Sequence, residues 1–504
     1  MKKILTLFSS LAMISTTGFL VVACNNTNNN PVKSEVIINN KQAVIDLWNK
    51  EFKNKLDSAK NTSLIVEMLK EKLPKKISDS IDLNGSLYEN TVSKLTKDEN
   101  NKLNQKVKVL VNKDVIELEV GSVKYGQQSI KYKTKDGKIV EKTKDEWEKM
   151  VWKDPSKKRQ KQEISDIVEV IQMGYYDDEG ENYLKPFNKN IHYVQAFEMP
   201  TNISKISALL PREVNSLSKV FNQITSANVD GIEKWDVSRV CQMSFLFDGA
   251  KNFNHDISNW DVKILRDANS MFADNAKFNQ NLGKWKPYNL AFARKMFARA
   301  KEFNQDLSSW KTSHVYNMEQ MFDGAEKFNS NLDKWDTSHV QTMKSMFSGA
   351  KAFNGNISSW NTSKVEDMTS MFRKTEEFNQ DISKWKTNSV KKMNYMFSEA
   401  KMFNQDISKW DISNVDEMNF MFNKASSFDQ NLSEWKVKEK VKHNNFAKGS
   451  KIESQSSKLP KFKDSNLSTP TSPTPATTAK PASTSTPTPT STPAPAPAPN
   501  PKMK

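Results

Sequence analysis

The strongest metal ligands and thiol nucleophiles of this 504-residue chain are two cysteines and five histidines. Two thiols are too few for a four-cysteine zinc site or a disulfide framework. His314 and His339 occupy equivalent positions 25 residues apart, but no further histidine or cysteine completes a metal site, so we favour exposed histidines at helix starts. Recurring polar pairs such as Gln305 and Asp306 favour hydrogen-bonded rungs over calcium sites. Cys241 is expected to be exposed and unpaired.

Sequence motifs of catalytic sites are missing from the chain. There is no G-x-S-x-G, H-E-x-x-H, G-x-G-x-x-G or phosphate-loop motif. We therefore expect no enzyme, no metal and no cofactor. An enzyme within residues 35–165 that needs only a few carboxylates is the alternative.

A stretch of basic residues is the candidate binding site. It contains six cations without an intervening acid and two aromatic residues: Lys284, Lys286, Tyr288, Phe292, Arg294, Lys295, Arg299 and Lys301. Such a group could hold an anionic glycan or a nucleic-acid strand. Sequence drift on a solvated face is the favoured alternative. Nucleic acid is not expected to be a partner, because residues 235–435 carry 26 basic and 25 acidic side chains.

The N-terminus has the pattern of a secretory signal. Two lysines precede an uncharged run from Ile4 to Ala23, and Cys24 follows. The sequence Leu20-Val21-Val22-Ala23-Cys24 resembles the lipobox of bacterial lipoproteins. This resemblance implies a signal peptide over residues 1–23 and a diacylglyceryl group on Cys24, which would anchor the protein at the extracellular face of the cell membrane. The alternative is an N-terminal membrane helix with an incidental cysteine.

A small α+β domain is expected over residues 35–165, after a flexible linker at 24–34. Apolar spacing between residues 41 and 73 predicts two amphipathic helices. Alternating valines around Asn112-Lys113-Asp114 predict a hairpin, and Asp136-Gly137 predicts a second one. Trp147 and Trp152 could be ligand platforms, but we favour packing against a helix.

A tryptophan recurs every 25 residues through the second half of the chain. The nine positions are Trp235, Trp260, Trp285, Trp310, Trp335, Trp360, Trp385, Trp410 and Trp435. Within one unit, Val340, Met343, Phe347 and Ala350 are spaced as on one face of a helix of about three turns. A short strand would follow. Such a unit cannot bury its own apolar face, so successive units must stack.

The expected fold is an α/β solenoid of helix-plus-short-strand repeats, similar to leucine-rich repeats, with the nine indoles in one internal column. Eight repeats would span residues 238–435, with an N-terminal cap at 166–237 and a C-terminal cap at 436–463. Residues 464–504 are rich in Pro, Ser, Thr and Ala and predict a disordered tail.

The repeated frame MFxxAxxFNQDISxW resembles the repeats of mycoplasma surface lipoproteins grouped with the Bacteroides-surface-antigen-like leucine-rich repeats. This resemblance implies surface display and attachment or host contact, and it transfers no catalytic residues. We expect adhesion to a host protein, an anionic glycan or a neighbouring cell. A structural or antigenic coat without a ligand and a nutrient-capturing lipoprotein are the alternatives, and the oligomeric state stays open.

Overall fold

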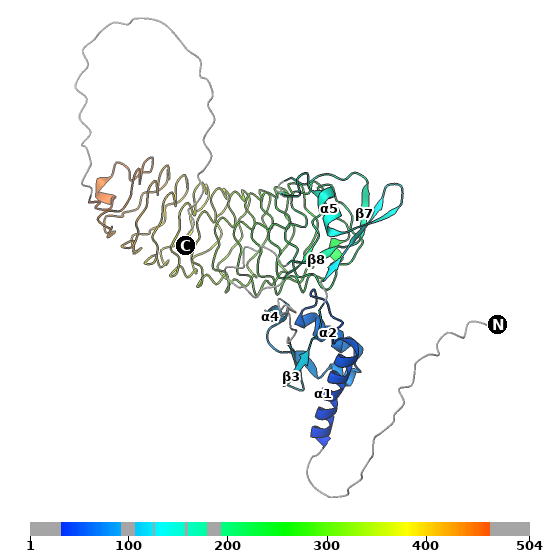
Figure 1. The fold of residues 1–504 in the computed structure, drawn as a ribbon. Coiled ribbons are helices and arrows are strands. Elements are labelled where there is room, and N and C mark those ends of the chain that lie inside the picture. The colour runs from blue at the N-terminus through cyan, green and yellow to red at the C-terminus, as the bar shows by residue number, and fades with distance from the viewer. Residues whose placement is uncertain (1–31, 92–105, 124–125, 157–159, 179–192, 464–504) are drawn as a thin grey trace, which may run out of the picture. The chain divides into compact units, whose positions relative to one another are not determined.

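The computed structural model describes residues 32–91, 106–123, 126–156, 160–178 and 193–463 (Figure 1). The proposed signal peptide, Cys24 and the tail at 464–504 lie outside the described residues, as does most of the linker. The chain divides into two units, Met1–Phe462 and Lys463–Lys504, and almost all described residues belong to the first.

The N-terminal part contains four helices and a three-stranded antiparallel sheet of order β1-β2-β3. The elements are α1 (Val32–Glu51), α2 (Thr62–Lys72), α3 (Lys75–Ser78), β1 (Ile81–Leu83), α4 (Leu87–Thr91), β2 (Lys106–Val111) and β3 (Asp114–Glu119). Val111 pairs with Asp114 across the turn, which confirms the first predicted hairpin. The helices α1 and α2 confirm the helical spacing between residues 41 and 73. Their apolar faces and the sheet share one core around Trp48 and Ile65.

Two further small antiparallel sheets follow, with strand orders β4-β8-β9 and β6-β5-β7. The elements are β4 (Gln127–Gln128), β5 (Ile130–Thr134), β6 (Ile139–Lys142), α5 (Lys144–Val151), β7 (Ile167–Gln172), β8 (Tyr175–Asp178) and β9 (Tyr193–Ala196). Strands β5 and β6 form the hairpin predicted around Asp136-Gly137. Helix α5 begins with a capping box in which Thr143 and Glu146 bind each other's backbone N–H groups.

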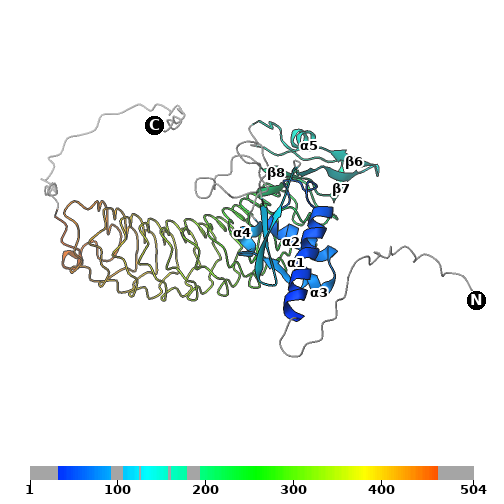
Figure 2. The same ribbon diagram turned by 60° about the horizontal axis from the view of Figure 1, so that its bottom comes forward.

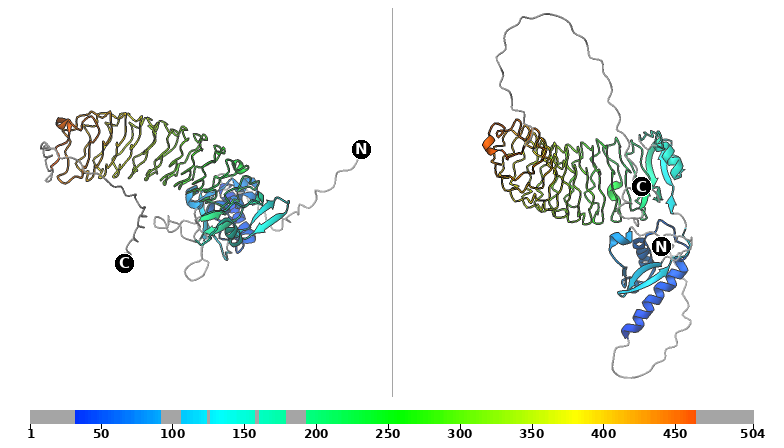
Figure 3. Two further views of the ribbon diagram at one scale, coloured as in Figure 1. Left: turned by 90° about the horizontal axis from the view of Figure 1, so that it is seen from above. Right: turned by 60° about the vertical axis from the view of Figure 1, so that its left-hand side comes forward.

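Turns make up most of residues 211–460, which we call the turn array (Figure 2). Within it, the structure has two short 3-10 helices, η1 (Ile232–Lys234) and η2 (Ser456–Lys458). Isolated parallel bridges join residues 25 positions apart, at Gln242, Asp267, Phe292, Asn317, Thr342, Asp367, Lys392, Glu417 and Lys442. Figure 3 shows the succession of turns from two further directions.

The expected α/β solenoid of helix-plus-strand repeats is wrong, because the described residues of the turn array form no α-helix and no strand longer than an isolated bridge. The backbone N–H groups of Met343, Ser345 and Phe347 donate to carbonyls 24 residues later, whereas a helix would use carbonyls four residues earlier. Ser345 has a left-handed φ of 54°. The regular secondary structure of the protein lies instead in the small antiparallel sheets and the helices of the N-terminal part.

The apolar positions of the repeat are nevertheless buried. The nine tryptophans are between 1% and 4% exposed, and Val340, Met343, Phe347 and Ala350 are fully buried. Equivalent phenylalanines stack on one another, as Phe322 and Phe347 do with ring centroids 5.6 Å apart and an interplanar angle of 2°. Side chains that the sequence placed on a helix face therefore reach the same core from consecutive turns.

None of the helices in the described part of the chain has both the length and the apolar character needed to cross a membrane.

Candidate functional site

The tryptophans join each 25-residue unit to the preceding one. From Trp260 to Trp435, every indole Nε1–H donates to the backbone carbonyl 28 residues earlier, at 2.8 to 3.2 Å. The sequence predicted the burial of these rings and missed their hydrogen bonds. A buried indole that lacks an acceptor is costly, and this requirement is a signal that could have been used.

A column of asparagines forms a second set of links. From Asn254 to Asn404, each side-chain Oδ1 accepts the backbone N–H of the residue 25 positions later, at 2.7 to 3.0 Å. The glutamine that follows such an asparagine donates from Nε2 to the preceding unit, as Gln305 does to Asn279. These polar residues support the predicted hydrogen-bonded rungs.

The glutamine column is interrupted in two consecutive units. The residues at this position are His255, Gln280, Gln305, Ser330, Gly355, Gln380, Gln405 and Gln430. Ser330 and Gly355 both lack the long amide side chain of their neighbours. A hollow with an empty volume of about 850 Å³ lies beside Ser330 and opens to solvent.

We call this feature the polar hollow. Its lining residues are Asn304, Gln305, Asp306, Ser308, Asn329, Ser330, Asn331, Asp333 and Lys334. They offer amides, hydroxyls, two carboxylates and one ammonium group, so the hollow contains both donors and acceptors. A hydrogen bond from the backbone N–H of Ser308 holds the pKa of Asp306 below its ordinary value, which keeps this carboxylate ionised at neutral pH.

Three of the six cations predicted to form a basic site already have acidic partners. Arg294 lies 3.3 Å from Glu319, and Lys301 lies 3.1 Å from Glu326. Arg299 binds Asp274 through two guanidinium nitrogens, and this hydrogen bonding holds the pKa of the Asp274 carboxyl below its ordinary value.

The remaining members of the predicted basic site are dispersed. Phe292 is only 8% exposed and packs edge-on against Tyr316 at 4.9 Å, whereas Tyr288 is 46% exposed. Lys284 is exposed, and Lys286 and Lys295 are half-buried. Within the described ranges, no side-chain hydrogen bond or ring contact joins any two of the eight residues. The structure therefore does not gather them into one site.

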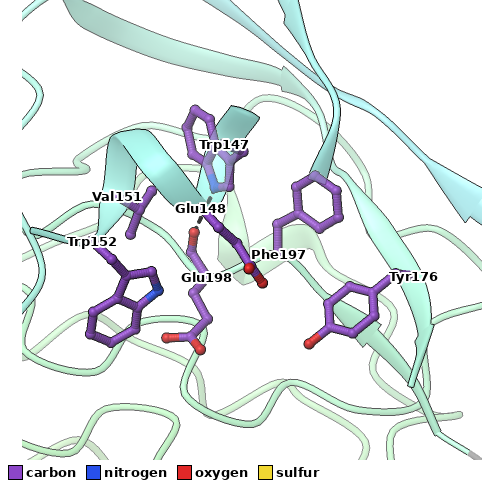
Figure 4. Close-up of a pocket in the computed structure, with 7 residues that line it drawn as sticks. All are labelled: Trp147, Glu148, Val151, Trp152, Tyr176, Phe197 and Glu198. Atoms are coloured by element: carbon purple, nitrogen blue, oxygen red, sulfur yellow. Dashed lines mark hydrogen bonds between the residues drawn. The ribbon is translucent and has the colours of Figure 1, made fainter. Parts of the chain in front are cut away.

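Trp147 and Trp152 line a small pocket with five other residues (Figure 4). Both indoles are at most 2% exposed. The Nε1–H of Trp147 donates to the carbonyl of Glu198 at 2.7 Å. Behind Trp152, the buried ammonium of Lys161 donates to the carbonyl of Lys219 and lies 3.2 Å from the carboxylate of Glu198. Burial lowers the pKa of Lys161 to about 8. These contacts make both tryptophans part of the core.

Cys241 is buried at 1% exposure, which corrects the expectation of an exposed thiol. It packs with Ile264 and with Tyr193, at the start of β9, so this first unit is covered where later units carry exposed polar residues. Burial raises the pKa of its thiol to about 12. His314 and His339 are exposed. No cluster of three or more potential metal-binding side chains occurs among the described residues.

The turn array is similar to one protein family. Residues 215–333, 306–384 and 356–459 match the family described as "Mycoplasma protein of unknown function, DUF285". Three overlapping matches agree with a repeated sequence of mycoplasma type. No curated protein and no solved structure matches the chain.

Proposed function

We propose that the protein is anchored by lipid at Cys24 on the outer face of the cell membrane, and that its turn array binds a component of a host or neighbouring cell non-covalently. The lipobox-like sequence Leu20–Cys24 supports the anchor. The resemblance of the repeated frame to mycoplasma surface lipoproteins supports display and attachment.

The observation that carries this proposal is the division of each unit into fixed buried positions and varied exposed ones. Met346 and Met371 are equivalent and fully buried. The equivalent residues Gln341, Glu366 and Lys391 are all exposed and differ in charge. Because the core does not depend on these exposed side chains, they are free to form a surface fitted to a partner.

The anchor is tested by growing cells with radiolabelled palmitate and comparing the wild type with Cys24→Ser. We expect label on the wild type alone and release of the wild type from intact cells by added protease. Unlabelled wild-type protein, or protein that added protease does not reach, would contradict the anchored location.

Binding is tested by adding the purified full-length protein to cultured epithelial cells at increasing concentration. A specific binder gives saturable binding that unlabelled protein competes away. Binding that stays linear would favour the coat protein without a ligand. Binding of a small nutrient without cell attachment would favour the capture lipoprotein.

A further inference from the structure

We propose that the polar hollow beside Ser330 binds a neutral saccharide through the hydroxyl groups of its sugar rings. This inference rests on the proposed surface-binding function and names the ligand class and the site. It concerns a different part of the turn array from the basic residues between Lys284 and Lys301.

The backbone around the hollow departs from the regular array. A Cβ atom added to Gly355 would lie 2.0 Å from the carbonyl oxygen of Ser330, so only glycine permits this close approach of two units. The N–H of Leu332 donates to the carbonyl of Asn356 at 3.0 Å. Asn331 also accepts the N–H of Asn356 at 2.9 Å. These bonds fix the floor of the hollow without the glutamine side chains that fill the same place in other units.

The groups around the hollow are held in place before a ligand arrives. The Oδ1 atoms of Asn304 and Asn331 each accept a backbone N–H of the next unit, at 2.9 Å. Their Nδ2 amino groups are donors that the ladder does not use. The carboxylate of Asp306 accepts the N–H of Ser308, which fixes its orientation. Sugar hydroxyls donate and accept at once, so a rigid set of amides and carboxylates suits them.

The charge of the hollow favours a neutral ligand. Asp306 and Asp333 contribute two negative charges and Lys334 one positive charge, so a polyanion such as heparin would meet net repulsion. Three oxygen-rich acids are absent from the lining, which disfavours a calcium ion that needs six to eight oxygen ligands. No apolar side chain lines the hollow, so it lacks the anchor pocket that peptide recognition uses.

The experiment measures binding of the full-length protein to immobilised neutral oligosaccharides ending in mannose, galactose or N-acetylglucosamine, with heparin alongside. Ser330→Gln restores the long amide of the regular column and fills the hollow. The double variant Asp333→Asn with Lys334→Gln changes only surface groups. Lys384→Gln is the matched control, because Lys384 is equivalent to Lys334 two units away and is also exposed.

We expect the wild type and Lys384→Gln to bind at least one neutral oligosaccharide with equal affinity. Ser330→Gln and the double variant should each raise Kd at least tenfold, while their melting curves stay cooperative. Unchanged binding by the double variant, or binding to heparin alone, would overturn the assignment of this site. If cells bind the protein and no neutral saccharide does, the inference fails and the proposed function stands. If the protein binds neither cells nor saccharide, both fail.

Discussion

The indole N–H of Trp360 donates to the backbone carbonyl of Leu332, 2.8 Å away and 28 residues earlier in the chain. The same oxygen also accepts the N–H of Trp335 at 3.0 Å, so two consecutive tryptophan positions meet at one carbonyl. Because Trp360 is buried, its ring contributes apolar contact and one hydrogen bond between units. This relationship explains why tryptophan, rather than another large apolar residue, recurs at this position.

Replacing Trp360 by Phe should lower the free energy of unfolding by about 1–3 kcal/mol, through loss of the hydrogen bond and part of the ring. Trp360→Ala should cost about 3–5 kcal/mol. Chemical denaturation monitored by circular dichroism measures both. Exposed Lys364→Ala is the control and should stay within about 0.5 kcal/mol of the wild type. A Phe variant as stable as the wild type would show that the hydrogen bond contributes nothing.

Asn275 is fully buried, and neither its Oδ1 nor its Nδ2 atom has a hydrogen-bond partner. Alanine occupies the equivalent positions 250, 300, 325 and 350, so the site accommodates a methyl group. Asn275→Ala should therefore stabilise the protein by about 1–3 kcal/mol. The matched variant is Thr375→Ala, because the Thr375 hydroxyl donates to the carbonyl of Phe372 at 2.6 Å. It should destabilise by about 1 kcal/mol, and thermal melts of the two variants should shift in opposite directions.

The turns require a left-handed backbone at equivalent positions. Gly349 has a φ of 69°, and Lys374 adopts 61° in the next unit. An added Cβ at Gly349 would meet only Gly324, at 3.5 Å, so substitution would strain the backbone without a severe clash. Gly349→Ala should cost about 1 kcal/mol, and Lys374→Gly should gain a similar amount. Urea titrations that show no difference between the two substitutions would contradict this account of the turns.

Asp267 should make the protein less stable as the pH rises from about 4 to 6. Burial raises the pKa of its carboxyl to about 6, above the value of about 3.9 in an unfolded chain. In this interval the folded state keeps the proton that the unfolded state has released, and the loss levels off above the folded pKa. Asp267→Asn removes the charge and keeps an oxygen that can accept the N–H of Asn269.

The variant should exceed the wild type in the free energy of unfolding by up to about 3 kcal/mol at pH 7 and should match it near pH 4. Urea denaturation at half-unit pH steps measures the difference. A constant difference at every pH would mean that Asp267 does not titrate in this range.

Sequence spacing predicted the buried positions and the N-terminal hairpins, because both depend on local patterns of apolar residues and turn residues. It failed for the helix of the repeat. Val340, Met343, Phe347 and Ala350 have helical spacing, yet the N–H of Met343 donates to Asp367 in the next unit. A chain of left-handed turns places alternate N–H groups toward the neighbouring unit and returns the same side chains to the core. Hydrophobic periodicity alone cannot distinguish these two backbones.

The candidate site was predicted poorly for a related reason. The basic residues between Lys284 and Lys301 are adjacent in the sequence, but the turns separate them and pair them with acids 25 residues away, as in Arg299 with Asp274. The polar hollow depends on two small residues, Ser330 and Gly355, in consecutive units. Their effect becomes visible only when equivalent positions are compared in space.

The most direct test of the proposed binding role compares two deletions of two complete 25-residue periods each. Removal of residues 311–360 eliminates most of the polar hollow, and removal of residues 361–410 leaves it intact. Both join a tryptophan to the first residue of a unit, so the spacing of the remaining tryptophans is unchanged. We predict that both variants fold and that only the protein lacking 361–410 keeps saturable binding to cultured epithelial cells. Equal binding by the two deletion variants would contradict the assignment of binding to the hollow.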